Sequence, residues 1–305
     1  MENFFKKVAK QISPRVKIEV DSSLTTEELD MRAKIVTFDI ENMANLLWSW
    51  STYGGKNGWN AIATEFPWHI MCFAYKWLGK KAEVVSVWDY KGYKPFLERH
   101  EDGTLTVNPQ NEYDLMLEMR NILHEADIVV GWNSKRFDIK KVQSKMIALG
   151  IEPPSPFKQI DVMQEKKRLA DSNSNKLEDT GIEWGLGRKL QHEGWPLWMG
   201  CAEGDQKSMR KMERYNIQDV NLTEKCYLYL RPWMQTHPNL NAYTLDVKAC
   251  SACGKKGTLE RRGFTPPTNT GFRRQRFVCQ TNRGGCGKWC SGTPDRPDDK
   301  LEIVK

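Results

Sequence analysis

The sequence predicts an α/β domain followed by a small cysteine-rich module. Between residues 34 and 232, short apolar stretches typical of buried strands alternate with longer stretches of helical periodicity. The cysteines divide the chain in a similar way, because three are scattered singly through this region and five lie between Cys250 and Cys290. A chain of 305 residues is long enough for one large core and one small module.

Charge follows the same division. Residues 248–305 carry 13 Lys and Arg against 5 Asp and Glu, a net charge of +8, and the first 247 residues carry 33 against 34. A basic module on a near-neutral domain indicates a polyanionic partner, although solubility accounts for part of such an excess. No apolar run approaches the ~18 residues that cross a bilayer, and a signal-peptide core is not seen. We therefore expect an unprocessed cytoplasmic protein with no membrane partner.

The domain is organised around an expected strand over residues 34–42, KIVTFDIEN. Residues 1–33 are polar and mixed in charge, and we expect a surface extension or partial disorder there. Side chains alternate across a strand, so Asp39 and Glu41 point to the same side near its end. Two carboxylates can hold a divalent metal, but a solvated turn is the commoner explanation when nothing else supports a site.

The Trp-rich stretch over residues 46–68 has no steady periodicity and is predicted to be a long loop beside these acids. Long loops in compact domains are often functional, and a surface excursion held by its Trp side chains is the alternative. Residues 70–77 and 83–88 are then expected to form two more strands, joined by a turn near Gly79 and Lys80.

Helices and strands alternate in the second half of the domain. Residues 111–125 favour a helix, residues 127–131 (DIVVG) favour a buried strand, and a helix is expected to begin near Ser134. Asp138 would therefore lie just after a core strand, where open α/β sheets place their sites. The alternative is an ordinary acid favoured by the helix dipole. A further short strand is expected over residues 160–162.

The longest helical stretch covers residues 205–230, after a shorter helix in LEDTGIEWGLGRK that Gly185 or Gly187 is expected to end. Tyr215 and Asp219 are four positions apart in the long helix and so share one of its faces. The plain alternative is a core tyrosine and an acid paired with a neighbouring base.

Taken in order, three short motifs resemble those of the DEDD superfamily of 3′–5′ exonucleases, in the branch whose third motif carries a tyrosine. FDIE, GWNSKRFD and YNIQDV are most similar to the exonuclease domain of family B DNA polymerases, and LEDTGIEWGLGRK resembles the segment before that family's last motif. The resemblance covers about residues 34 to 232. It implies an RNase H-like fold, with a central mixed sheet flanked by helices, and phosphodiester hydrolysis at DNA 3′ ends by two metal ions.

The resemblance also implies a role for each acid around two Mg²⁺ or Mn²⁺ ions. Asp39 would bridge both ions, and Glu41 and Asp219 would hold the ion that activates water. Asp138 would support the second ion, largely through water. Tyr215 would orient the attacking water rather than act as a strong base, since its unshifted pKa is ~10.

Substrate contacts are expected beside these acids. Asn42 stands where the family commonly has Thr, and the Trp-rich stretch after it is longer than the family pattern, so binding of the terminal nucleotide is left open. Asn133 and Phe137 are expected to contact substrate or position the second motif, with simple packing of the turn as the alternative. The other DEDD branch uses a histidine near its last acid. None of the five histidines lies in the last helix, so we expect them to be structural.

The cysteine-rich module over residues 248–292 resembles a zinc ribbon. Paired knuckles separated by a hairpin can place four thiolates around one structural Zn²⁺, and a module of this size has too small a core to fold readily without such a metal. Reduced free cysteines are the alternative. The predicted ligands are Cys250, Cys253, Cys279 and Cys286.

The fourth ligand is the least regular part of this pattern. Six residues, rather than the usual two, separate Cys279 from Cys286. Cys286 is chosen because a glycine follows it, as one follows Cys253, and Cys290 is the rival.

Arg and aromatic residues interleave between the two ends of the module. Arg273, Arg274 and Arg276 are predicted to contact nucleic-acid phosphates while nearby Phe side chains stack on bases. A ribbon that docks a protein is the competing hypothesis.

These observations predict a stand-alone, metal-dependent 3′–5′ exonuclease that acts on DNA, in proofreading for a separate polymerase or in DNA processing, since too few residues follow for a polymerase domain. The second hypothesis is an RNA exonuclease or a structure-specific endonuclease, and the third is a non-catalytic nucleic-acid-binding factor. The expected parts are an extension (1–33), the nuclease domain (34–232), a linker (233–247), the zinc ribbon (248–292) and a charged tail (293–305).

Overall fold

The structure is a computed structural model that describes residues 33–50, 61–243, 248–268 and 272–295. The expectations for nearly all of the amino-terminal extension, for the middle of the Trp-rich stretch and for most of the charged tail lie outside these residues. The chain divides into two compact units between Cys226 and Tyr227. The larger unit contains the central sheet, and the smaller contains the cysteine module.

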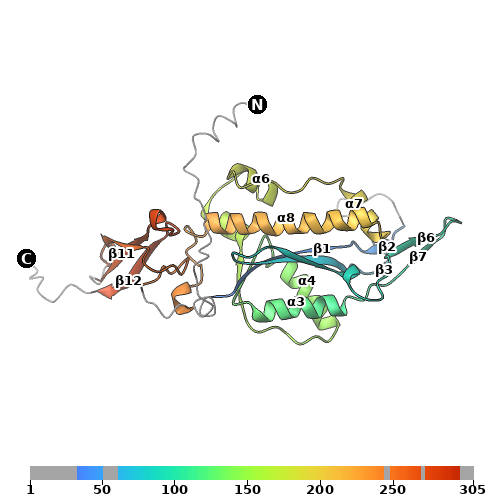
Figure 1. The fold of residues 1–305 in the computed structure, drawn as a ribbon, viewed down its shortest axis with the longest axis horizontal. Helices are drawn as coiled ribbons and strands as arrows, with labels where there is room; N and C mark the ends of the chain where they lie inside the picture. The colour runs from blue at the N-terminus through green and yellow to red at the C-terminus, as the bar shows by residue number, and fades with distance from the viewer. Residues whose placement is uncertain (1–32, 51–60, 244–247, 269–271, 296–305) are drawn as a thin grey trace, which may run out of the picture. The chain divides into compact units, whose positions relative to one another are not determined.

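A five-stranded mixed sheet forms the centre of the larger unit, in the order β5-β4-β1-β8-β9 (Figure 1). β1 pairs antiparallel with β4 and parallel with β8. At the two edges of the sheet, β5 pairs antiparallel with β4 and β9 pairs parallel with β8. The predicted class, a central mixed sheet flanked by helices, is therefore confirmed. The strands are β1 (Ile35–Asn42), β4 (Ile70–Trp77), β5 (Glu83–Ser86), β8 (Ile128–Gly131) and β9 (Lys158–Asp161).

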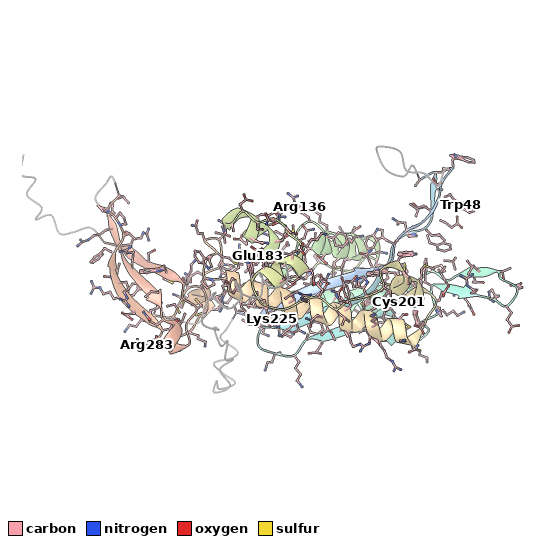
Figure 2. All side chains as sticks on the ribbon, turned by 90° about the horizontal axis from the view of Figure 1, so that it is seen from above. Trp48, Arg136, Glu183, Cys201, Lys225 and Arg283 are labelled. Atoms are coloured by element: carbon pink, nitrogen blue, oxygen red, sulfur yellow. The ribbon has the colours of Figure 1, made fainter. Side chains whose placement is uncertain are left out.

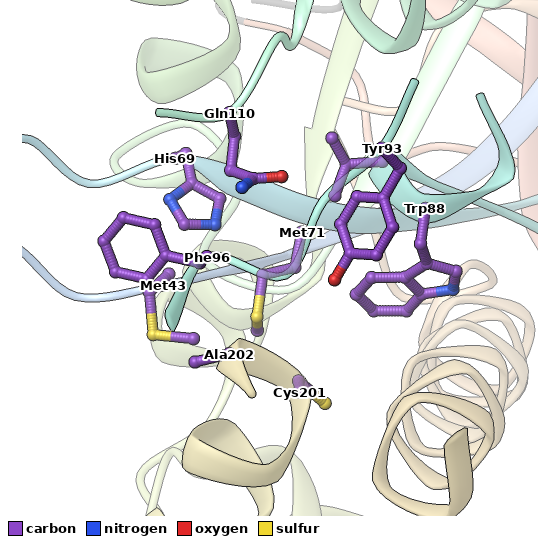
Figure 3. A pocket seen from close by; sticks show the side chains of 10 residues that line it. Met43, His69, Met71, Trp88, Tyr93, Phe96, Gln110, Cys201 and Ala202 are labelled. Carbon is purple, nitrogen blue, oxygen red and sulfur yellow. The ribbon is translucent and has the colours of Figure 1, made fainter. Parts of the chain in front are cut away.

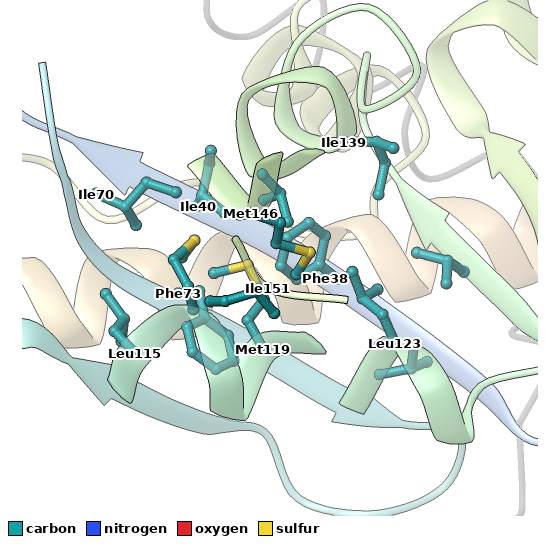
Figure 4. Packing of buried hydrophobic residues seen from close by; sticks show 14 of the residues in the cluster. Phe38, Ile40, Ile70, Phe73, Leu115, Met119, Leu123, Ile139, Met146 and Ile151 are labelled. Carbon is teal, nitrogen blue, oxygen red and sulfur yellow. The ribbon is translucent and has the colours of Figure 1, made fainter. Parts of the chain in front are cut away.

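One face of the sheet packs on the main apolar core. Val36, Phe38 and Ile40, at alternate positions of β1, are buried in this cluster (Figure 4). Two helices supply much of the rest, α3 (Tyr113–Glu125) and α4 (Asp138–Ala148). Burial at about 25 cal/mol per Å² of apolar surface holds both helices to this face.

The opposite face of the sheet is covered by α8 (Gln206–Leu230) and α7 (Trp195–Ala202), which share a second apolar cluster with β4. Because side chains alternate along β1, Asp39 and Glu41 point to this face. Their partners on β4 are Ala74 and Cys72. These small side chains leave space for α8 above the acids.

Two element boundaries differ from the predictions. α4 begins at Asp138 rather than near Ser134, because the residues between it and β8 form a turn. The end of the strand expected over residues 83–88 is instead a 3₁₀ turn, η1 (Val87–Asp89).

Two short helices follow β9. α5 (Val162–Leu169) begins inside the stretch expected to be a strand over residues 160–162, because Asp161 caps it by accepting the N–H of Gln164. α6 (Leu177–Glu183) ends just before Gly185, whose φ of +69° makes it one of the expected glycine stops. Among the helices that the structure describes, none combines the length and apolar character needed to span a bilayer.

The prediction of a loop throughout the Trp-rich stretch is wrong. Its two described ends pair as antiparallel strands, β2 (Leu46–Trp48) and β3 (Ala63–Phe66), and Figure 2 shows Trp48 standing away from the rest of this unit. All three side chains of β2 are exposed, so the alternation by which a strand is recognised is missing. A second hairpin, β6 (Leu97–Arg99) and β7 (Leu105–Val107), was not predicted either.

The cysteine module folds around a three-stranded antiparallel sheet, so a third strand joins the expected hairpin. The strands are β10 (Leu259–Phe264), β11 (Arg273–Cys279) and β12 (Trp289–Asp295). A 3₁₀ turn, η3 (Thr281–Arg283), follows β11, and another, η2 (Leu240–Tyr243), lies in the expected linker.

Candidate active site and cysteine centre

Three of the predicted acids meet where β1 faces α8. One carboxylate oxygen from each of Asp39, Glu41 and Asp219 lies within 4.8 Å of the other two. Strand alternation brings the first two to this face, and α8 carries the third across it. Oxygen ligands converging in this way suit a hard divalent cation such as Mg²⁺ or Mn²⁺.

Asn216, which the sequence analysis did not single out, joins α8 to β1. Its Nδ2 atom donates a 2.7 Å hydrogen bond to Oδ2 of Asp39, and its Oδ1 atom lies 3.9 Å from Sγ of Cys72. The side chain is fully buried. Because Asn216 directly follows Tyr215 and precedes Asp219 by three positions, these contacts set the rotation of α8 that turns both residues toward the acids.

Asp138, the fourth predicted acid, approaches from the turn between β8 and α4. Its Oδ1 atom accepts a 3.3 Å hydrogen bond from the backbone N–H of Ile40, and the residue is only 3% exposed. Its charge acts on Asp39, but its oxygens lie outside the group of three that meet within 4.8 Å. The four acids therefore surround one site, with Asp138 at its margin.

An unusual turn places Asp138. Asn133 has a φ of +61°, a conformation that few residues other than glycine adopt. The carboxylate of Asp161 braces this turn by accepting the backbone N–H groups of Asn133 at 3.0 Å and Lys135 at 3.2 Å. The turn also needs Gly131, because a Cβ atom there would lie 2.5 Å from Cβ of Ser134.

Asp161 was missed by sequence reasoning. The available signal was an acid at the end of an expected strand, followed three positions later by Gln164, which is the pattern of a helix cap. That signal indicates a cap on α5, but not the second role of bracing the turn before Asp138.

Burial and mutual repulsion raise the pKa values of the carboxyls. The pKa of Asp39 lies well above its usual value because of burial first and then the charges of the other three acids. Burial, followed by the charge of Asp219, raises the pKa of Glu41 to about 8, and burial raises that of Asp138 to about 7. A bound cation would favour the ionised forms, so the donor set fits a metal.

Asp219 provides a further test of that fit. Its Oδ1 atom is buried and has no hydrogen-bond partner in the part of the chain that the structure describes. Leaving a buried acceptor unsatisfied costs about 1–3 kcal/mol. A metal ion bound to this oxygen would remove that cost, and a carboxylate oxygen of Asp219 lies within 4.8 Å of oxygens of Asp39 and Glu41.

Lys189 is the main residue of the site that the sequence analysis missed. Its Nζ atom lies 2.5 Å from Oδ2 of Asp219 and 4.7 Å from the centre of the Tyr215 ring. Burial lowers the pKa of Lys189, but the charge of Asp219 and the hydrogen bonds with Asp219 and Tyr215 together outweigh burial and raise the pKa above its usual value, so the amine is protonated. The available signal was its place at the end of LEDTGIEWGLGRK.

Tyr215 is held beside the acids as a neutral phenol. Burial and then the charge of Asp219 raise its pKa further above the usual value. His192 and Trp198 meet its ring edge-to-face, with centroid distances of 4.8 and 6.3 Å. The Trp198 indole N–H also donates to the backbone oxygen of Asn42 at 3.3 Å, so α7 contacts both the tyrosine and the end of β1.

The residues predicted to contact substrate differ in their exposure and in the contacts that they already make within the protein. The Nδ2 atom of Asn42 donates to the next residue's carbonyl at 3.2 Å, and Asn133 forms the turn described above. Phe137 is 43% exposed. The Nζ atom of Lys141 lies 5.0 Å from its ring and 3.8 Å from that of Trp68. An exposed ring and a cation therefore lie next to the second motif.

The cavity in Figure 3 is not a substrate pocket. It has a volume of about 10 Å³, room for about one water molecule, and its walls include Met43, Met71 and Phe96. His69 also lines it, and burial lowers the pKa of this imidazole to about 3. His69 is therefore a neutral, packed side chain.

The cysteine module brings its four predicted ligands together. Four sulfur atoms lie within 4.8 Å of one another, those of Cys250, Cys253, Cys279 and Cys286. The Sγ atoms of Cys250 and Cys286 are 3.8 Å apart, and those of Cys253 and Cys279 are 3.7 Å apart. A tetrahedron with 2.3 Å Zn–S bonds has edges of about 3.8 Å. The sulfur spacing therefore fits zinc.

The two knuckles turn in the same way. Gly254 and Gly287, which follow Cys253 and Cys286, have φ values of +70° and +79°. Their N–H groups donate to the carbonyls of Cys250 and Cys279 at 2.8 and 2.9 Å. The rival ligand is close by, because Sγ of Cys290 lies 3.9 Å from Sγ of Cys250.

A mixed sheet whose central strand presents carboxylates to a covering helix defines the RNase H-like class of nuclease folds. The sequence pattern of the RNase H superfamily matches residues 79–231, about half of the chain, and the chain belongs to that superfamily. The match begins after β4, so Asp39 and Glu41 lie outside it and are placed by the structure alone.

Among solved structures, the chain is similar to the family B DNA polymerase from the hyperthermophilic archaeon Pyrobaculum calidifontis. The TM-score is 0.44 and the sequence identity 14%, over 66% of this chain and 25% of the polymerase chain. This chain thus spans about a quarter of that polymerase's length. No curated protein matches the sequence.

Proposed function

We propose that this protein is a divalent-metal-dependent 3′–5′ exonuclease of the tyrosine DEDD branch that releases nucleotides from DNA 3′ ends. The observation that carries the proposal is the meeting of three carboxylates within 4.8 Å, with Tyr215 and Lys189 beside them. Membership of the RNase H superfamily supports nuclease activity in general. The direction of digestion and the preference for DNA belong to the proposal.

Asp39, Glu41 and Asp219 would hold the metal ions, with Asp138 supporting them from the margin. Two Mg²⁺ or Mn²⁺ ions would supply charge stabilisation for the attacking and leaving oxygens of phosphodiester hydrolysis. Asn216 contributes by holding one oxygen of Asp39, which fixes the orientation of that carboxylate.

Tyr215 and Lys189 would act on water and phosphate. The neutral hydroxyl of Tyr215 can hydrogen-bond the attacking water and orient it, and the packing of His192 and Trp198 keeps the ring in place. Lys189 presents a protonated amine next to the acids, where it can bind an oxygen of the scissile phosphate. Its pairing with Asp219 keeps the amine within reach of that position.

The strand would enter past the second motif and the end of β1. Phe137 offers an exposed ring for base stacking next to Asp138, and Lys141 offers a cation beside it. Asn42 and Asn133 are proposed to contact the terminal nucleotides. Arg273, Arg274 and Arg276 of the cysteine module are proposed to bind nucleic acid, and one structural Zn²⁺ would be held by the four cysteines.

Hydrolysis of a 5′-labelled DNA single strand tests the proposal. With Mg²⁺, the protein should shorten the strand from its 3′ end and release mononucleotides. Asp39→Asn keeps the side chain's shape but removes a charged ligand, so we expect at least a thousandfold slower hydrolysis with an unchanged circular dichroism spectrum. Equal rates for the variant and the wild type would overturn the site assignment.

Product size and matched RNA strands separate the alternatives. Faster digestion of RNA would indicate an RNA exonuclease, and internal fragments would indicate an endonuclease. Binding without cleavage in both Mg²⁺ and Mn²⁺ would indicate a non-catalytic binding factor. Cooperation with a separate DNA polymerase stays a prediction.

A further inference from the structure

The sheet of the cysteine module has two faces of different character. Alternation along β11 places Cys279 on the side of the sulfur cluster and Arg274 and Arg276 on the opposite, outer side. Arg273 falls on the cysteine side, where its guanidinium lies 4.1 Å from the centre of the Phe264 ring. Arg273 therefore lies on a different face of the sheet from Arg274 and Arg276.

Trp289 lies on the outer face. It pairs with Val278 across the strands, whereas the next residue, Cys290, points to the sulfur cluster. The Trp289 side chain is 55% exposed, which is unusual for so large an aromatic residue. The guanidinium of Arg276 lies 5.6 Å from the centre of its ring. Arg274, Arg276 and Trp289 are referred to below as the Trp289 face.

The Trp289 face is basic. Arg274 and Arg276 are both exposed, and Arg274 donates to the backbone oxygen of Gly292 at 3.3 Å rather than to a carboxylate. Glu260 is also on this side of the sheet, but Arg262 pairs with it at 3.0 Å. Residues 248–305, which comprise the module and the charged tail, carry a net charge of +8. An anionic ligand complements this surface.

We propose that the Trp289 face binds single-stranded nucleic acid, with one base stacked on the indole and the adjoining phosphates held by Arg274 and Arg276. Stacking on a side chain needs a base outside a duplex, because the neighbouring base pairs of a duplex cover the base faces, and it tolerates any sequence since every base has a π face. The inference rests on the proposed function in taking nucleic acid as the ligand. It adds a second site, built from residues of the cysteine module, and assigns it to Trp289.

The binding of a fluorescein-labelled dT20 strand measures this site directly. The full-length, zinc-loaded protein carries Asp39→Asn in every sample and no Mg²⁺ is added, so the strand is not cleaved. Trp289→Ala should weaken binding about tenfold or more, as loss of one base–aromatic stack does, and Trp289→Phe should keep most of the affinity. Arg276→Gln should weaken binding and reduce the salt slope by about 0.7.

Arg283→Gln is the matched control. Arg283 is an exposed residue of η3 in the same module, outside the three strands, and its loss changes the net charge by the same amount (Figure 2). We expect binding within twofold of the parent. Zinc content and melting temperature should be equal in all variants that enter the comparison. The proposal is overturned if Trp289→Ala binds dT20 as tightly as the parent does. It is also overturned if Arg283→Gln and Arg276→Gln lose equal affinity. Either result would favour binding by diffuse charge or a protein partner for this face.

Failure of this inference can be told apart from failure of the proposed function. Binding of dT20 in the Asp39→Asn background requires no turnover, so it reports on the Trp289 face alone. Digestion of a five-nucleotide strand by the Trp289→Ala variant with Mg²⁺ requires no contact with the Trp289 side chain, so it reports on the carboxylate site. A protein that binds through Trp289 but digests nothing supports the inference and refutes the nuclease proposal.

Discussion

Lys189 places a positive charge beside the acids and Tyr215. Its ammonium group compensates the charge of Asp219, at 2.5 Å, and lies beside Tyr215. A divalent cation bound to the same acids would be repelled by this charge. We propose that this one side chain opposes metal binding and also binds substrate phosphate.

Lys189→Gln should for this reason change two properties in opposite directions. Affinity for Mn²⁺, measured by calorimetry, should rise about tenfold, because a positive charge near the ligands is removed. Turnover on a single strand should fall at least tenfold, since a phosphate contact is lost. Lys211→Gln, which removes the partner of the exposed Glu193, is the control and should change neither value. A Lys189 variant with weaker metal binding would contradict this account.

The carboxyls also make stability depend on pH. Their folded-state pKa values are raised, to about 8 for Glu41 and about 7 for Asp138, so the folded state holds protons more tightly than the unfolded chain. Stability must then fall as pH rises from the ordinary carboxyl pKa of about 4 toward 8.

We therefore expect the melting temperature of the Mg²⁺-free, zinc-loaded protein to drop by several degrees between pH 5.5 and pH 8. Saturating Mg²⁺ should flatten this dependence by favouring the ionised carboxylates, and Asp39→Asn should reduce it, because the variant removes a carboxyl whose own pKa is raised. A profile that is the same in Asp39→Asn and in the wild type would assign the effect to groups elsewhere.

At the scale of elements, the turn between β8 and α4 is the part that positions a functional group by backbone geometry. Asn133 is held at positive φ, Asp161 binds two N–H groups of the turn, and Gly131 lets Ser134 approach closely. α4 consequently starts with Asp138 at the site. The helix dipole alone would allow that acid anywhere in the first turn.

Gly131→Ala should disturb this turn, because the added methyl group would lie 2.5 Å from Cβ of Ser134. We expect a loss of about 1–3 kcal/mol in the free energy of unfolding and at least a tenfold drop in turnover. Adding Ser134→Gly removes the clashing atoms and should restore part of both. Gly150→Ala, strained by a φ of +68° but with open space around it, should cost about 1–2 kcal/mol without affecting turnover.

At the scale of the whole molecule, the chain combines a large unit with its own apolar core and a small unit organised around sulfur. Among the residues of the module that the structure describes, the buried apolar cluster consists of Cys250, Ala252 and Cys279, which is far too little to stabilise three strands. We therefore propose that metal binding supplies much of the module's folding free energy.

Substitution of single cysteines tests this dependence and identifies the fourth ligand. We expect one zinc per chain by elemental analysis of the wild type. Cys286→Ser should lose most of that zinc, and hydrogen exchange should then accelerate in β10–β12 but not in β1 or β8. Cys290→Ser should keep both zinc and protection. The reverse result for the two variants would make Cys290 the ligand.

Several features follow from sequence because they depend on near neighbours. Alternation along one strand puts Asp39 and Glu41 on one face, and helical spacing puts Tyr215 and Asp219 on another. Glycines after Cys253 and Cys286 mark two matching knuckles. The sequence did not predict the strand β2, because its side chains are exposed on both sides and show no alternation of buried and exposed positions.

By itself, then, the sequence determined which acids and cysteines are present and which of them share a face. The tertiary structure decided which other residues join them. Asn216 meets Asp39 across 177 positions of sequence, Asp161 braces a turn 28 positions earlier, and Lys189 reaches Asp219 from outside α8. Contacts between distant segments depend on how helices and strands pack, and packing leaves no periodic mark on the sequence of either partner.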